Sequence, residues 1–140
     1  DTPINAVLKP GESWYVNELE IVLENPTFNP GCSGSLGFEI VIRNKSSNNK
    51  KIESRRIYIS DDKSNNYENI YFKTGVASPA CYSNTLASFQ IGQIESDSYK
   101  DYAFRSTMEM KKGINEIIVM IPEVYERISP RWSIDIISGQ

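Results

Sequence analysis

Short segments of alternating apolar and polar residues constrain this chain more than any other feature. Residues 14–24 place Leu19, Ile21 and Leu23 on one side and glutamates on the other. Because successive side chains of a strand point to opposite faces of a sheet, a period of two residues is typical of a half-buried β-strand. The sequence therefore predicts that a strand of this kind spans residues 14–24.

The same pattern recurs along the chain. We expect strands over residues 36–43, 52–60, 67–72, 86–94, 99–110, 114–121 and 132–136, with a helix as the alternative for 86–94. Polar clusters at 44–49 and 61–66 are typical of hairpin tips. Segments 99–110 and 114–121 resemble a late hairpin around a turn at 111–113, and residues 124–128 favour one helical turn.

These elements predict an all-β fold. Short strands separated by turn clusters, without long helical patterns between them, indicate an antiparallel sandwich or barrel. We favour a sandwich of seven to nine strands with at most one or two short helical turns. We find no internal repeat or linker, so we expect a single domain over residues 1–140, with Trp14 and Trp132 in its core.

The absence of histidine narrows the chemistry of the chain. Without an imidazole, neither Ser-His or Cys-His nucleophilic catalysis nor a histidine-ligated zinc is available. The 18 acidic residues leave room for a pair of catalytic carboxylates, but the required separation is spatial and no pair stands out in the sequence. We therefore expect a protein that is not an enzyme.

Charge and hydropathy limit the kinds of partner that we expect for this chain. The net charge is −3 and the basic doublets are scattered among carboxylates, so we expect no nucleic-acid partner. Every apolar run is far shorter than the roughly 20 residues of a membrane helix, and no signal-like segment is present. We expect no membrane span, and a fragment of a larger secreted or anchored protein.

Two cysteines, Cys32 and Cys81, lie in loop-like surroundings rich in glycine, proline and serine. A disulfide between them would close about 50 residues and stabilise the fold by roughly 4 kcal/mol in the chain-entropy estimate. Such a bond persists in oxidising compartments, which favours an extracellular or cell-surface location. The alternative is a pair of buried free thiols in an intracellular protein.

Two groups of residues are candidates for ligand binding. The polar segment at 61–68 offers oxygen ligands for a weak calcium site, with a solvated hairpin tip as the alternative; its candidate ligands are Asp61, Asp62, Ser64, Asn66 and Glu68. Tyrosines form the second group, because exposed aromatic rings stack on sugar faces. The candidate platform consists of Tyr67, Tyr71, Tyr82, Tyr99 and Tyr102. Apart from calcium, we expect no cofactor.

Parts of the sequence resemble bacterial immunoglobulin-like domains of unknown function. The resemblance rests on PGESW at 10–14, LEI at 19–21, GFEIVIRNK at 37–45 and YISDD at 58–62. It implies an immunoglobulin-like sandwich that serves as an accessory module of a secreted or membrane-anchored protein, and it supplies no catalytic residues. The chain departs from antibody domains because its cysteines lie in loops and not on facing central strands.

The sequence favours a non-enzymatic extracytoplasmic β-sandwich module for protein interaction, sensing or spacing. Its specific ligand, a protein or a glycan, is not revealed by any motif. The competing hypothesis is a carbohydrate-binding module that uses the tyrosine platform, with calcium held by the Asp61 and Asp62 loop. Sandwich folds host many functions, so the fold alone does not choose between the two.

Overall fold

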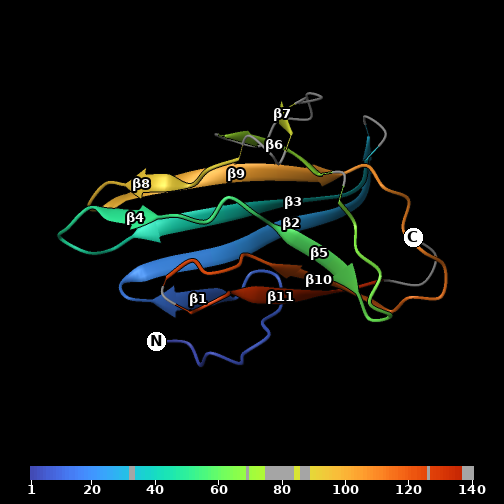
Figure 1. Ribbon diagram of the computed structural model, residues 1–140, viewed down its shortest axis with the longest axis horizontal. Coiled ribbons are helices and arrows are strands. Elements are labelled where there is room, and N and C mark those ends of the chain that lie inside the picture. Colours follow the sequence, from blue (N-terminus) through green and yellow to red (C-terminus); the bar gives the residue numbers. More distant parts are fainter. Residues whose placement is uncertain (32–33, 69, 75–83, 86–88, 126, 137–140) are drawn as a thin grey trace.

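The computed structural model describes residues 1–31, 34–68, 70–74, 84–85, 89–125 and 127–136 of the chain. Its strands are β1 (Ser13–Val16), β2 (Leu19–Gly31), β3 (Gly34–Asn44), β4 (Lys50–Ile52), β5 (Tyr58–Asp61), β6 (Ile70–Thr74), β7 (Asn84–Thr85), β8 (Gly92–Ile94), β9 (Ser98–Ser106), β10 (Glu116–Met120) and β11 (Arg131–Asp135) (Figure 1). The described residues contain no helix, so none that could cross a membrane.

The strands form three antiparallel sheets. The largest has the order β1-β2-β3-β9-β6-β7, the second has the order β11-β10-β5, and β4 pairs with β8 in a short ribbon. The all-β antiparallel sandwich expected from the sequence is thus confirmed, whereas the immunoglobulin-like connectivity is not. The strands outnumber those expected because two predicted strands are each divided and because β7 lies outside every predicted segment.

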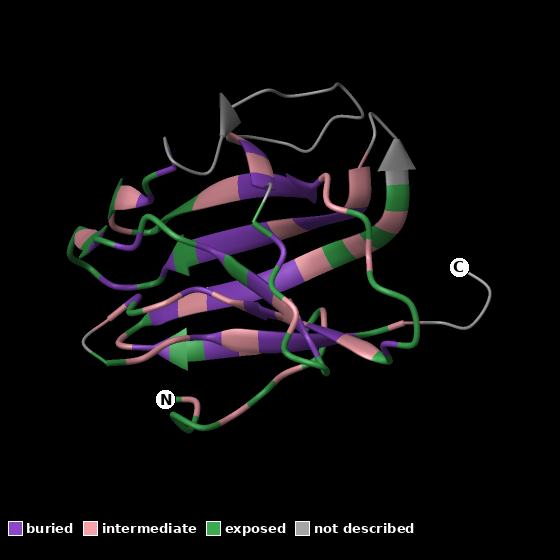
Figure 2. Cartoon of the chain, turned by 45° about the vertical axis from the view of Figure 1, so that its right-hand side comes forward, coloured by how far each residue is buried: buried purple, intermediate pink, exposed green. Residues whose placement is uncertain are grey.

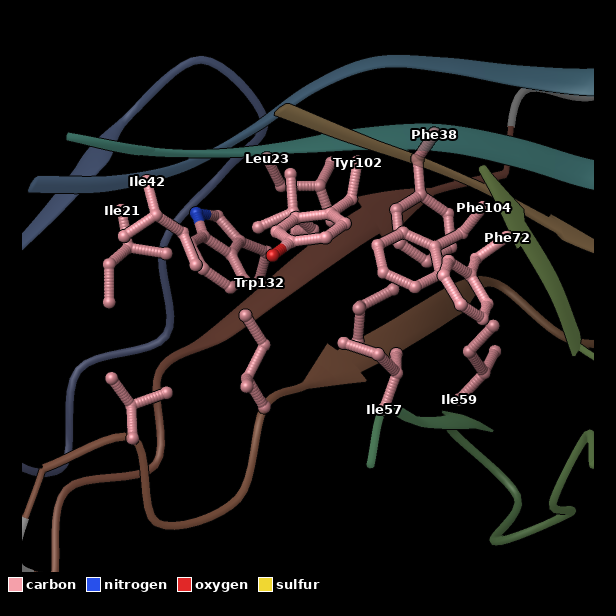
Figure 3. Packing of buried hydrophobic residues seen from close by; sticks show 14 of the residues in the cluster. Ile21, Leu23, Phe38, Ile42, Ile57, Ile59, Phe72, Tyr102, Phe104 and Trp132 are labelled. Atoms are coloured by element: carbon pink, nitrogen blue, oxygen red, sulfur yellow. The ribbon is translucent and has the colours of Figure 1, made fainter. Parts of the chain in front are cut away.

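The core lies between the large sheet and the β11-β10-β5 sheet. Alternate residues of β2, β3, β6 and β9 point toward Trp132 and Ile59 of the smaller sheet (Figure 3). Both tryptophans are fully buried, as expected, and each indole N–H donates to a backbone carbonyl: Trp14 to Arg131 and Trp132 to Glu12. These bonds satisfy the polar atom of each ring inside an apolar core. Figure 2 shows the buried residues between the sheets and exposed residues along the N-terminal segment.

A tight hairpin divides the first predicted strand. Val16 pairs with Leu19, and Asn17 and Glu18 between them have φ of 47° and 63°. Positive φ at both central residues is the conformation of a two-residue turn that matches the twist of antiparallel strands. The expectation of one continuous strand over 14–24 is therefore wrong.

The second division lies between β4 and β5. Ile52 ends β4, Tyr58 begins β5, and the two strands belong to different sheets. Residues 53–57 have no strand assignment, although the sequence predicts a single strand over 52–60. This segment crosses from the ribbon to the smaller sheet, and its place in the fold is central to the candidate site below.

Two local expectations near the C-terminal end are also corrected. The predicted late hairpin does not form, because β9 pairs with β3 and β6 while β10 pairs with β11 and β5. The connection 107–115 joins the two sheets instead. In place of the expected helical turn at 124–128, the described residues Tyr125 and Ile128 form an antiparallel bridge.

Candidate functional site

The segment 53–57 lines two adjoining hollows at the edge of the smaller sheet. One is a cavity of about 680 Å³ with buried Ile57, Ile59, Tyr67 and Ile70 in its lining. The other is a cavity of about 510 Å³ that extends toward Pro122, Glu123 and Ser129. Both are lined by Arg55, Arg56 and Tyr58. We call the two cavities together, joined at these three residues, the edge groove.

Cationic side chains and a tyrosine form the rim of the edge groove. The guanidinium of Arg56 donates from Nη1 to the Tyr58 hydroxyl over 3.1 Å, and this hydrogen bond raises the pKa of Arg56. The Tyr58 side chain is 44% exposed, and both arginines are exposed. In the described part of the chain, neither Arg55 nor Arg56 takes part in an ion pair. The groove therefore presents two guanidinium groups without an ion-pair partner among the described residues, beside an apolar floor.

The two serine hydroxyls in the edge groove are bound to backbone atoms. Ser54 Oγ donates to the Arg56 carbonyl over 3.4 Å, and Ser129 Oγ accepts the Glu123 N–H over 3.0 Å. Neither hydroxyl is hydrogen-bonded to a side chain that could act as a general base.

Asp61 closes the turn that follows β5. Its carboxylate accepts the N–H groups of Lys63 and Asn65, the Asn65 amide, and the Tyr67 hydroxyl over 2.6 Å. Burial raises the pKa of Asp61, but the hydrogen bonds from Tyr67, Asn65 and Lys63 outweigh it and hold the pKa at about 2. The carboxylate is therefore ionised and fully engaged within the turn.

Asp62 ties the same turn to the start of β10. Its Oδ1 accepts the N–H of Asn115 over 2.9 Å and the N–H of Glu116 over 3.4 Å, and the Asn115 bond is the main cause of its lowered pKa. Ser64 is exposed, and Asn66 and Glu68 line the edge groove. Among the described residues, no cluster of acidic, histidine or cysteine side chains is arranged to hold a metal. The three acidic candidates, Asp61, Asp62 and Glu68, are therefore not gathered as such a cluster, and calcium binding by the five candidates stays a prediction.

The five candidate tyrosines do not form one platform. Tyr67 and Tyr102 are 1% and 2% exposed, so their expected exposure is wrong. Tyr102 lies in phase with Phe104 on the core side of β9, and burial raises its pKa to about 12. Tyr71 and Tyr99 do lie on the outer face of the large sheet. Tyr82 lies outside the described residues.

Tyr71 and Tyr99 occupy opposite ends of that outer face. Tyr71 pairs with Arg105, whose guanidinium carbon lies 5.1 Å from the ring centre. Tyr99 pairs with Arg43 and is 63% exposed. Six residues of β9 separate the two positions, which corresponds to about 20 Å along a strand. A single sugar-binding row cannot include both.

A different pair of tyrosines shares one cross-strand row. Tyr15, 47% exposed, pairs with Glu20, Glu20 pairs with Arg43, and Arg43 pairs with Tyr99. The Tyr15 hydroxyl donates to Glu20 over 3.0 Å, and Arg43 and Lys45 lie 3.7 and 3.3 Å from the same carboxylate. This row joins β1, β2, β3 and β9 with an aromatic ring at each end.

The centre of the outer face carries three carboxylates. Glu24 pairs directly with Glu39, and Asp101 lies one strand away on β9. Burial, followed by the charges of Glu39 and Glu24, raises the pKa of Asp101, while Arg43 lowers it. One Asp101 carboxylate oxygen is buried without a hydrogen-bond partner. The ionised form of Asp101 is therefore energetically unfavourable on this face of the sheet.

Sequence reasoning identified parts of these sites and missed others. It singled out neither Arg55 nor Tyr58. The sequence does mark the segment 53–57, because the apolar residues change from an even position at Ile52 to odd positions at Ile57 and Ile59. Cys32 and Cys81 lie outside the described residues, so their pairing stays a prediction.

Comparisons with known proteins do not assign a family or a function to the chain. No protein-family model matches the chain, and neither the curated proteins nor the solved structures gave a match. The function is therefore argued from the residues themselves.

Proposed function

We propose that this chain is a non-enzymatic, extracytoplasmic β-sandwich module that binds a protein ligand in the edge groove. The observation that carries the proposal is the combination of an apolar floor, which includes Ile57 and Ile59, with a rim of two guanidinium groups that have no ion-pair partner among the described residues. Concave apolar surfaces with a few convergent polar groups are the usual ligand sites of proteins, and arginine and tyrosine are enriched where proteins bind one another.

Two features support binding over catalysis. The chain has no histidine, and the two serine hydroxyls of the groove, on Ser54 and Ser129, are bonded to backbone atoms. The carboxyl group with a raised pKa, Asp101, lies on the outer face of the large sheet and does not line the groove.

The extracytoplasmic location rests on the predicted disulfide between Cys32 and Cys81.

Selection from a random dodecapeptide library displayed on phage tests this proposal. The immobilised chain should enrich clones that lose at least tenfold in binding to a variant carrying Arg55→Ala, Arg56→Ala and Tyr58→Ala, because these substitutions remove the rim. All three side chains are exposed, so the variant should keep its thermal midpoint. A matched control carries Lys111→Ala and Lys112→Ala on the connection 107–115. Failure to enrich clones, or equal binding to all variants, would overturn the proposal.

Glycan binding is a second candidate, favoured by the cross-strand row with Tyr15 and Tyr99 at its ends. Three strand spacings place the two positions about 14 Å apart. A glycan array probed with the chain and with a Tyr15→Ala, Tyr99→Ala variant tests this candidate. Signals that disappear in the variant support it, and uniform non-binding of the parent chain refutes it.

A further inference from the structure

We infer that the edge groove recognises an extended peptide segment with an acidic side chain, which pairs through its main chain with residues 55–57. This inference rests on the proposed function and specifies its ligand. Three observations carry it: the state of the backbone in this segment, the two guanidinium groups, and the distribution of carboxylates along the groove.

The backbone of residues 55–57 is not used by the sheets. Within the described residues, its only hydrogen bond is the one that the Arg56 carbonyl accepts from Ser54 Oγ. On one side of the segment, the Ser54 carbonyl still accepts the Ile91 N–H at 3.5 Å; on the other, Tyr58 enters β5 and pairs with Met120. A stretch of unpaired N–H and C=O groups beside open cavities is a template for a partner strand.

The rim specifies the charge of that strand. Guanidinium groups bind carboxylates through paired, charge-assisted hydrogen bonds. Arg56 is already oriented by its hydrogen bond to Tyr58, and neither Arg55 nor Arg56 has an ion-pair partner in the described structure. Alternate side chains of an added strand face opposite sides. One side chain therefore meets the guanidiniums, while its neighbour faces the apolar floor at Ile57 and Ile59.

Carboxylates elsewhere in the groove limit where the acidic residue lies. Glu68 lines the larger cavity and Glu123 lines the smaller one, whereas Glu53 is paired with Lys51 over 3.3 Å. Positive charge thus lies in the middle of the groove, and each cavity holds a glutamate that forms no ion pair with the described residues. The complementary peptide has a central acidic residue next to an apolar one, with neutral or basic residues toward its ends.

The test uses the clones enriched on the parent chain. We expect their sequences to share an Asp or Glu adjacent to an apolar residue. Replacing that acid by its amide in a synthetic dodecapeptide should weaken binding about tenfold to a hundredfold, as for loss of a charge-assisted hydrogen bond. Two further peptides carry N-methyl groups on alternate backbone nitrogens near the acid, one on the odd positions and one on the even positions. One of them should bind about tenfold to a hundredfold more weakly and the other almost as well as the parent peptide, because only one edge of a strand pairs with the groove.

Charge reversal separates this inference from the proposed function. Selection on an Arg55→Glu, Arg56→Glu variant should enrich basic peptides in place of acidic ones, and a Lys111→Glu, Lys112→Glu control should still enrich acidic peptides. Clones that need the groove rim but lack a shared acid, or tolerate N-methylation at both sets of positions, would overturn the inference while leaving the proposed function intact. Clones that do not need the groove rim would overturn both.

Discussion

Replacing Asp61 with asparagine is expected to destabilise the fold and to remove part of its acid sensitivity. Asparagine is nearly isosteric, and its carbonyl oxygen can still accept the N–H groups of Lys63 and Asn65. Its amide group, however, takes the place of the oxygen that accepts the Tyr67 hydroxyl and the Asn65 amide. Two hydrogen bonds to a charged acceptor are lost, and two amide donors face each other.

The magnitude follows from the burial of the partners. A hydrogen bond to a charged group contributes about 1.5–3 kcal/mol, and the Tyr67 hydroxyl is buried, so the substitution should cost about 2–4 kcal/mol at neutral pH. That is a large fraction of the 5–15 kcal/mol that typically stabilises a domain. Tyr67→Phe should cost about 1–2 kcal/mol, because it also leaves the N–H of Lys111 without its acceptor.

The pH dependence gives the substitution a specific signature. The pKa of Asp61 is lowered from 3.8 to about 2 in the folded protein, so its ionised form favours folding. This stabilisation is complete well above the unfolded pKa and is lost as the pH falls through the folded pKa. The stability difference between the parent chain and Asp61→Asn should therefore be constant near neutrality and shrink between about pH 4 and pH 2.

Urea unfolding of the parent, Asp61→Asn, Tyr67→Phe and the double variant measures these quantities. A double-mutant cycle should give a coupling energy of about 1–2 kcal/mol between the two side chains. Additive effects would show that the 2.6 Å hydrogen bond contributes nothing specific. A stability difference that persists unchanged to about pH 2 would refute the argument that the charge of Asp61 stabilises the turn.

Three further predictions concern other parts of the chain. Asp101→Asn should stabilise the fold by up to about 1 kcal/mol at neutral pH, because the raised pKa of Asp101 makes its ionisation unfavourable in the folded protein. Below about pH 4 this gain should disappear, and equal urea midpoints at neutral pH would contradict the prediction. Alkylation before intact-mass measurement should label Cys32 and Cys81 only after reduction, whereas labelling without reduction would exclude their disulfide. Millimolar calcium should leave the thermal midpoint unchanged; a rise that is abolished by Asp61→Ala with Asp62→Ala would restore the metal site.

Alternation of apolar residues was enough to predict the fold class, and a closer use of its phase would have located the strand breaks. Residues of the core cluster fall at even positions in β1, Trp14 and Val16, and at odd positions in β2, Leu19, Ile21 and Leu23. A two-residue turn produces this change, because the residues that flank it pair with each other and face the same side. The predicted strand over 14–24 contained this signal, but Asn17 and Glu18 lack the glycine that usually marks such turns.

Residue type alone did not predict the roles of polar side chains. Asp61 and Asp62 carry the oxygen atoms of a calcium loop, yet those oxygens accept backbone and side-chain donors of the turn and of β10. Tyr67 was expected on the surface because tyrosine tolerates water, but its ring is buried and its hydroxyl bonds to Asp61. The bonds of Asp62 join residues more than 50 positions apart. Those of Asp61 lie within six residues, but they depend on the geometry of the turn, which residue type alone does not encode.

The candidate site arises from the same kind of phase change that divides the first strand. Between Ile52 and Ile57 the apolar phase shifts, so a continuous strand would place one of these side chains in water. The chain avoids this by leaving the ribbon after β4 and entering the smaller sheet at β5, which keeps both isoleucines buried. The consequence is an intervening segment whose backbone pairs with no strand, with Arg55 and Arg56 at its centre. A break that satisfies the core thus leaves an unpaired, positively charged edge, and that edge is where we expect the partner strand to bind.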